Sequence, residues 1–259
     1  GEQFIIQAIA KNRSIIYKND ASKLTAATCS SENGLLPRKD SEKGTYRTGP
    51  NSANCRVKIL ILYTQQALNA AQNSVSNITA LGYTALSQTN TSLVNSGING
   101  RVTGGAPVFL NQANLQQPIN NNPTTAADNL STDPWIQNLR VNNRADIVVL
   151  LHQYTFNVNG GEIVGSVGLT GFANPTRPVA VVKTTFATNA GFTFAHEVGH
   201  LFNARHFTDN ASPPGRGHQF AFAGNNQGTL LTNTIPFGQR VLQFSNPDIN
   251  FNGLPTGTA

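Results

Sequence analysis

The chain has 259 residues, of which 39% are hydrophobic and only 12% are charged. This length allows one large domain or two modest ones, and the apolar content excludes a disordered chain. The net charge of +6 comes from scattered Lys and Arg residues. Because nucleic-acid binding requires clustered basic side chains, we expect no nucleic-acid partner. No apolar run approaches the ~20 residues of a membrane-spanning helix, so we expect no membrane partner either.

The N-terminal part of the chain differs in character from the rest. Two short apolar strands are predicted at residues 4–6 and 14–17, separated by turn-forming residues. Residues 30–54 are rich in Gly, Pro, Ser and charged residues, a composition typical of an exposed, cleavable linker. We therefore divide the chain into an N-terminal segment with a linker, residues 1–54, and a second domain, residues 55–259. The absence of Met, including at position 1, indicates a processed or trimmed product.

From residue 55 onward, strand patterns alternate with helix patterns. This alternation predicts an α/β fold with a twisted, mostly parallel sheet. The last 50 residues are rich in Gly, Asn and Pro and predict a small, irregular C-terminal subdomain. The predicted strands cover residues 56–62, 108–110, 146–151 and 178–183. The predicted helices cover residues 65–93 (one or two helices), 131–142 (with a cap at 131–134) and 190–203.

The segment 192–206, FTFAHEVGHLFNARH, carries the strongest chemical signal in the chain. His196 and His200 are four residues apart, so on a helix their imidazoles project from one face. Two imidazoles placed in this way can bind a single Zn²⁺ at about 2.0–2.1 Å. Glu197 lies beside His196 and slightly off the metal axis, where it can take a proton from the attacking water. Glu197 is therefore the candidate general base, and the helix is the candidate active-site helix.

A catalytic zinc needs a third protein ligand and an open fourth position. His206 is the candidate, but a straight helix would carry it about 9 Å along the axis beyond His200. The helix must therefore end between them, and Asn203 tolerates the left-handed conformation that a C-cap turn requires. The alternative is an amphipathic core helix with two solvent-facing histidines. Against it, three of the five histidines in the chain fall at this spacing.

The motif in residues 196–206 resembles a known zinc-binding signature. HExxHxxGxxH is the zinc signature of the metzincin metallopeptidases, and residues 196–206 match it except that Asn203 replaces the Gly. Residues 57–68, VKILILYTQQAL, and 243–259, QFSNPDINFNGLPTGTA, resemble bacterial reprolysin-like enzymes of the peptidyl-Asp metallopeptidase type. The resemblance covers roughly residues 55–259. It implies a sheet-bearing upper subdomain, a small irregular lower one, and a substrate cleft between them.

The resemblance implies a zinc-dependent endopeptidase with one catalytic zinc ion and with protein or peptide substrates. We expect it to be secreted and monomeric. Metzincins carry a Met-containing turn beneath the zinc, whereas this chain has no Met and places Leu231 at the equivalent position. Phe207, after the third His, departs from the main subfamilies, and no Tyr follows Leu231 to act as a fifth ligand. Arg240 lies in the stretch that walls the primed pocket in metzincins. It is a candidate for binding an acidic substrate side chain, with an exposed Arg of no special role as the alternative.

Cys29 and Cys55 are the only cysteines in the chain. Their even number allows one disulfide that closes a polar loop. The family resemblance offers another role, because residues 1–54 resemble the end of a propeptide. A Cys29 thiolate could then occupy the fourth position on the zinc and hold the enzyme latent. Both interpretations stay open.

Two other classes of protein also stay open. A zinc-binding pseudoenzyme without turnover is consistent with the missing Met but not with the retained Glu197. A secreted adhesion module with a coincidental motif would bind no zinc. Outside the motif, we expect His152 and His218 to be surface or packing histidines. Asp209 either braces the region after His206 or is an ordinary turn residue.

Overall fold

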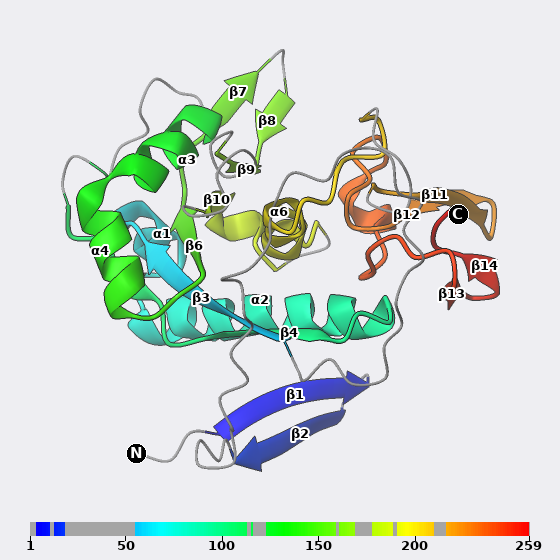
Figure 1. Cartoon of the computed structure of the whole chain (residues 1–259), viewed down its shortest axis with the longest axis horizontal. Coiled ribbons are helices and arrows are strands. Elements are labelled where there is room, and N and C mark those ends of the chain that lie inside the picture. The colour runs from blue at the N-terminus through cyan, green and yellow to red at the C-terminus, as the bar shows by residue number, and fades with distance from the viewer. Residues whose placement is uncertain are drawn as a thin grey trace. The chain divides into compact units, whose positions relative to one another are not determined.

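The computed structural model consists of two compact units, residues 1–56 and residues 57–259 (Figure 1). In the first unit, β1 (Phe4–Ala10) pairs with β2 (Arg13–Lys18) in an antiparallel hairpin. Both strands are longer than the sequence predicts. Cys29 and the linker lie outside the described residues. The structure describes residues 4–10, 13–18, 55–112, 115, 123–158, 161–168, 178–188, 191–209 and 216–258.

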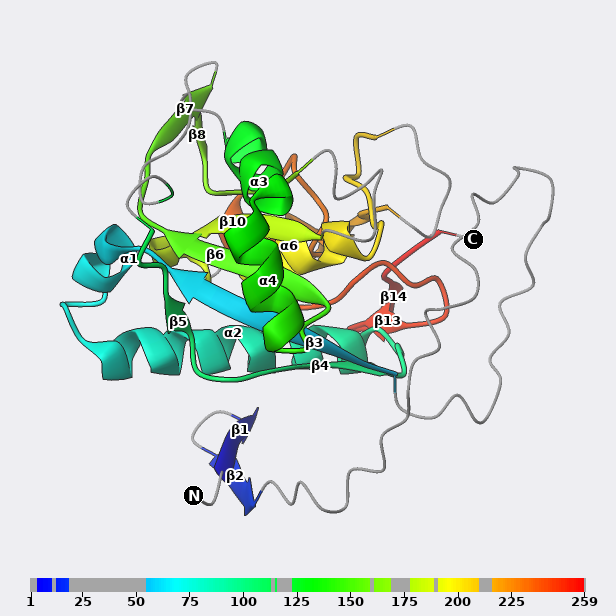
Figure 2. The ribbon, with the colours of Figure 1, turned by 60° about the vertical axis from the view of Figure 1, so that its left-hand side comes forward.

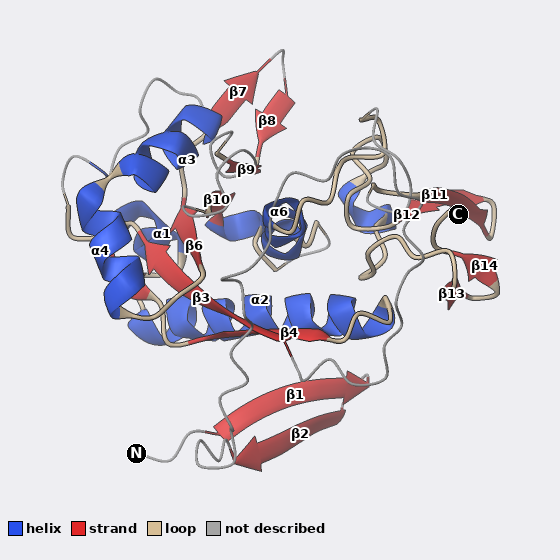
Figure 3. Cartoon of the chain, in the orientation of Figure 1, coloured by secondary structure: helices blue, strands red, loops and turns tan. Residues whose placement is uncertain are grey.

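The second unit is built on a six-stranded sheet with the order β4-β3-β6-β10-β9, in which β5 also pairs with β3 (Figure 3). β3, β5, β6 and β10 are parallel, and β9 runs antiparallel to β10 at one edge. The mostly parallel sheet predicted from the alternating pattern is therefore confirmed. The strands are β3 (Cys55–Tyr63), β4 (Gly100–Gly104), β5 (Val108–Phe109), β6 (Ile147–His152), β9 (Gly165–Val167) and β10 (Val179–Lys183).

Helices cover both faces of this sheet (Figure 2). β6 and β10 are buried along their whole length, which explains their continuous apolar sequences. Alternate residues of β3 enter two separate cores, so that Ile59 and Ile61 lie with residues of α2 and α6, whereas Leu60 and Leu62 lie with residues of α3 and α4. The helices are α1 (Gln65–Ala70), α2 (Val75–Asn95), α3 (Pro123–Thr132), α4 (Pro134–Asn142) and α6 (Thr193–Leu201), with short 3-10 turns η3 (Thr184–Phe186) and η4 (Phe237–Gln239).

Side-chain caps explain where several helices begin. The Thr64 hydroxyl accepts a hydrogen bond from the Ala67 amide at the start of α1, and the Ser74 hydroxyl caps α2 in the same way. Two caps in one stretch account for two helices where the sequence allowed one or two. Asp133 caps α4. The cap predicted within residues 131–134 is therefore Asp133. The two residues before it end α3, a helix that the sequence did not predict.

The remaining elements are short hairpins and turns, and those in the last 50 residues agree with the irregular C-terminal part that the sequence predicts. None of the helices in the described part of the chain is both long and apolar enough to cross a membrane. The hairpins pair β7 (Phe156–Val158) with β8 (Gly161–Ile163), β11 (Gln219–Phe222) with β12 (Asn225–Gly228), and β13 (Asn250–Phe251) with β14 (Leu254–Pro255).

Candidate metal centre

The helix α6 carries the first two histidines into the interior. It packs against β9, β10 and α2, and its residues from Thr193 to His200 are all buried. The side chains of His196 and His200 are each only 6% exposed. The helix is shorter than predicted at both ends, because Phe192 at its start has a φ of 48° and the chain turns immediately after Leu201.

The turn after α6 brings His206 back toward the helix. Asn203 has a φ of 67°, in the left-handed region, as the sequence predicts. The amide of Ala204 donates to the Gly199 carbonyl at 3.0 Å, and the amide of Asn203 donates to the His200 carbonyl at 2.8 Å. These two bonds define a Schellman motif, the usual way to satisfy the last carbonyls of a helix. The motif reverses the chain direction within a few residues.

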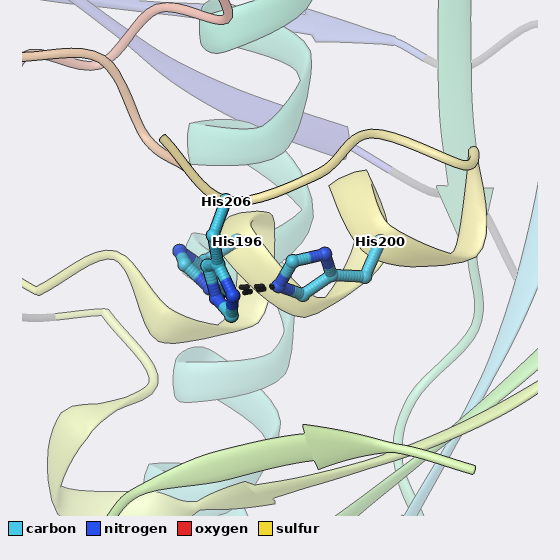
Figure 4. A group of neighbouring side chains, drawn as sticks. All are labelled: His196, His200 and His206. Carbon is cyan, nitrogen blue, oxygen red and sulfur yellow. Dashed lines mark hydrogen bonds between the residues drawn. The ribbon is translucent and has the colours of Figure 1, made fainter. Parts of the chain in front are cut away.

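The three imidazoles converge at their Nε2 atoms (Figure 4). The Nε2 atoms of His196 and His200 are 3.0 Å apart, and each lies 3.0–3.1 Å from Nε2 of His206. A tetrahedral ion held at about 2.0–2.1 Å from each nitrogen would space them roughly 3.3 Å apart. The three side chains are therefore arranged as ligands of a single ion.

The hydrogen bonds of the rings show which nitrogen carries the proton. Nδ1 of His196 lies 2.6 Å from the Leu230 carbonyl, and Nδ1 of His200 lies 2.8 Å from the Ala204 carbonyl. A carbonyl oxygen can only accept, so both Nδ1 atoms are donors and both Nε2 atoms carry lone pairs. Burial lowers the pKa of His200 to about 4 and that of His196 well below its usual value, which keeps both rings neutral. Lone pairs that meet at 3.0 Å repel each other unless a cation lies between them, so the residues fit a zinc ion.

Glu197 lies beside this cluster and is only 4% exposed. Burial raises the pKa of its carboxyl to about 8, although the positive charge of Arg240 acts in the opposite direction. Within the described part of the chain, no residue donates a hydrogen bond to this carboxylate. A buried carboxyl group of raised pKa, one residue after a histidine of the cluster, makes Glu197 a candidate for a functional role.

A β-turn at residues 229–232 also supports the cluster, and in it the Thr232 amide donates to the Thr229 carbonyl at 3.0 Å. Leu230 supplies the carbonyl that holds His196. Leu231 is 2% exposed and lies so close to α6 that a Cβ on Gly199 would come within 3.1 Å of it. Leu231 is thus a buried apolar residue that packs against α6. The roles of the Leu230 and Ala204 carbonyls have no signal in the sequence, because any residue offers a carbonyl.

Arg240 is not an exposed side chain without contacts. Its Nε donates to the Thr232 carbonyl at 2.9 Å, and one Nη donates to the Gly191 carbonyl at 3.2 Å. Burial lowers its pKa to about 10, and the charge of Glu197 raises it. Arg240 therefore joins the supporting turn to the segment before α6 and keeps a positive charge close to the metal cluster. Arg240 is thus half-buried and hydrogen-bonded rather than fully exposed.

The other candidate residues have separate positions. The Asp209 carboxylate accepts a hydrogen bond from the His206 amide at 3.0 Å, so Asp209 braces the segment that carries the third ligand. His152 is buried on β6 and stacks on Tyr154 with ring centroids 5.0 Å apart, in agreement with a packing role. His218 is half-buried and stacks on Phe220. The predictions for the two cysteines fall on Cys29 and on the side chain of Cys55, which lie outside the described residues.

The fold and the three-histidine cluster define a metallopeptidase domain. A family model described as metallo-peptidase family M12B, reprolysin-like, matches residues 80–207, which end just after the third histidine. Residues 80–207 thus match the reprolysin-like metallopeptidase family, and the family resemblance inferred from the motif is confirmed.

Curated relatives agree with this assignment. The chain is 26% identical over 274 residues to a peptidyl-Asp metalloendopeptidase of Xanthomonas campestris, an alignment that covers 100% of this chain and 61% of the relative. It is 26% identical over 260 residues to a peptidyl-Asp metalloendopeptidase of Stenotrophomonas maltophilia, which covers 96% of this chain and 59% of the relative. The chain therefore spans about three fifths of the length of these relatives.

A solved structure described as a chaperone-substrate complex has a similar fold. The TM-score is 0.58 at 16% identity, and the match covers 79% of this chain and 31% of that chain. This similarity supports the fold alone.

Proposed function

We propose that the chain is an endopeptidase that hydrolyses internal peptide bonds of proteins with the help of one zinc ion. The observation that carries the proposal is the convergence of three Nε2 atoms beside the buried carboxylate of Glu197. His196, His200 and His206 would hold the ion. When bound, zinc supplies Lewis acidity, which lowers the pKa of a water molecule and polarises the carbonyl of the substrate.

The side chains of the chain would perform the proton transfers. Glu197 accepts a proton from the attacking water at a carboxylate oxygen, while the water oxygen bonds to the carbonyl carbon of the scissile peptide. Glu197 then donates that proton to the departing amine as the carbon–nitrogen bond breaks. The group that accepts the proton in the first step is thus the acid that returns it in the second. The burial of Glu197 keeps bulk water from competing for the proton.

Glu197→Gln is the direct test, because it keeps the shape of the side chain and removes the base. We expect cleavage of an unfolded protein substrate to fall by at least about a hundredfold while zinc content stays at one ion per chain. His206→Ala, in contrast, should lose both cleavage and the zinc ion. Asp248→Asn, which changes an exposed carboxylate, is the matched control. Bound zinc with no cleavage, both by the full chain and by a chain trimmed to start near Cys55, would instead indicate the pseudoenzyme, and absence of zinc would indicate the adhesion module.

The proposal extends to a preference for acidic residues next to the cleaved bond. Two facts support it: the relatives are named peptidyl-Asp metalloendopeptidases, and Arg240 holds a positive charge close to the metal cluster. Leu231 would form an apolar part of the same pocket. Arg240→Gln should reduce the ratio of kcat/KM for an Asp peptide to that for its Asn analogue, whereas Arg240→Lys should keep part of it. Arg101→Gln, at an exposed position, should leave the ratio unchanged. An unchanged ratio in Arg240→Gln would refute this assignment.

The N-terminal segment is proposed to act as an inhibitory prosegment of a secreted, monomeric enzyme. Cys29 would either ligate the zinc or form a disulfide with Cys55. A count of free thiols on unfolded, unreduced protein separates the two, since two free thiols would exclude the disulfide and none would exclude the zinc ligand. If Cys29 blocks the metal, the Cys29→Ser variant of the full chain should cleave substrate faster than the unaltered chain.

A further inference from the structure

Gly165 is the first residue of β9, the edge strand that runs beside the active-site helix α6. Its φ lies outside the left-handed region, so the backbone conformation does not require a glycine. The space around it does. A Cβ built on Gly165 would lie 2.5 Å from Oε1 and 2.9 Å from Cδ of Glu197, and 2.6 Å from Cγ2 of Thr193. The carboxylate of Glu197 therefore fills the volume that any side chain at residue 165 would need.

Neither element can move apart freely to make room. The strand is attached to β10 on both sides of Gly165, where the Lys183 amide donates to the Val164 carbonyl at 2.7 Å and the Gly168 amide donates to the Val179 carbonyl at 3.3 Å. On the other side, His196 precedes Glu197 in the same helix, so a shift of α6 would displace a proposed metal ligand. The carboxylate of Glu197 is the part that can yield most easily.

We propose that Gly165 is a positioning residue for the reaction: because it has no side chain, it leaves the space in which the carboxylate of Glu197 is held beside the metal site. This inference rests on the proposed role of Glu197 as general base. A methyl group at residue 165 rotates or displaces the carboxylate while leaving the three histidines in place. Since a misplacement of about 1 Å at a reacting group can reduce the rate by about a hundredfold, the effect falls on turnover.

The first experiment compares Gly165→Ala with Gly105→Ala in the zinc-loaded full chain. A Cβ on Gly105 would meet no atom within 4 Å, so this exposed glycine is a matched control. We expect Gly165→Ala to reduce kcat by roughly ten- to a hundredfold, with KM changed by less than about threefold and with one zinc per chain retained. Gly105→Ala should match the unaltered protein. A rise in KM alone, or loss of zinc, would overturn the proposal, because Gly165 would then serve substrate binding or the metal ligands.

A double-mutant cycle identifies the contact that matters. Glu197→Asp withdraws the carboxylate by one methylene, so the methyl of Gly165→Ala no longer meets it. In the Glu197→Asp background, Gly165→Ala should therefore change kcat by less than about twofold. Equal losses in both backgrounds would overturn the proposal. So would recovery of kcat when Thr193→Ser is added to Gly165→Ala, since the conflict would then lie with the Thr193 methyl.

The outcome of Glu197→Gln separates this inference from the proposed function. Full activity in Glu197→Gln would reject the general base itself. Loss of activity in Glu197→Gln together with normal kcat in Gly165→Ala would reject only the positioning role of Gly165.

Discussion

The turn at Asn203 is expected to limit the stability of the domain in a way that substitutions can measure. Asn203 has a φ of 67°, and its side chain is exposed, with one long hydrogen bond of 3.3 Å from Arg205. The left-handed conformation costs a residue with a Cβ about 1–2 kcal/mol of free energy; the cost is smaller for Asn and smallest for Gly. Because little surface is buried there, the backbone decides the result. We expect Asn203→Ala to lose about 1 kcal/mol of unfolding free energy and Asn203→Val more, whereas Asn203→Gly should equal or exceed the unaltered protein.

Thermal and urea unfolding of the full chain measures this series. In a domain of this size a loss of 1 kcal/mol corresponds to a Tm about 2–4 °C lower. Each variant should be measured with a chelator and with saturating zinc, since bound metal adds its own stabilisation. Asn138→Ala is the control, because Asn138 is an exposed residue inside α4, where Ala should be neutral or slightly stabilising. Equal unfolding free energies for the unaltered protein, Asn203→Ala, Asn203→Val and Asn203→Gly would refute the reasoning.

Three further predictions concern the surroundings of the metal site and the core. Leu231→Met conserves volume, so we expect a stability change below about 1.5 kcal/mol and unchanged zinc content, measured by thermal unfolding and metal analysis. Gly217→Ala should weaken zinc affinity by roughly ten- to a hundredfold in a chelator competition, because its Cβ would come within 2.5 Å of the Leu231 backbone and displace the turn that holds His196. Burial and then the charge of Lys183 lower the pKa of His152 from 6.5 to about 3, so between these values the unfolded chain binds a proton that the folded one does not. Stability therefore falls as pH decreases from 7 to 5, by up to about 2 kcal/mol from this residue, and the loss should be smaller in His152→Asn.

The sequence predicted those parts of the fold that depend on strong local patterns. β6 and β10 consist of continuous apolar residues, and α6 carries two histidines at helical spacing, so each was recognisable. β4 and α3 were missed because their local signals are weak. β4 is a short edge strand with two glycines, and α3 begins in a stretch rich in Asn and Thr. Both elements form through contacts with the sheet and its helices rather than through their own propensities.

The same distinction applies to the site. The ligand spacing and the left-handed turn at Asn203 could be inferred, because both depend on side-chain type and on position along the chain. The carbonyl of Leu230 and the space that Gly165 leaves for the carboxylate of Glu197 could not, because a backbone oxygen and a missing side chain leave no specific mark in a sequence. Arg240 was identified as a candidate, but its attachment to the carbonyls of Thr232 and Gly191 depends on residues distant in the chain.

Zinc X-ray absorption on the purified full chain, combined with metal analysis, tests the central claim most directly. The three-histidine centre predicts one zinc ion per chain with three nitrogen ligands at about 2.0–2.1 Å, and one nitrogen fewer or no retained zinc in His206→Ala. A chain that retains no zinc, or that binds it without imidazole nitrogen, would contradict the metal centre and the function proposed from it.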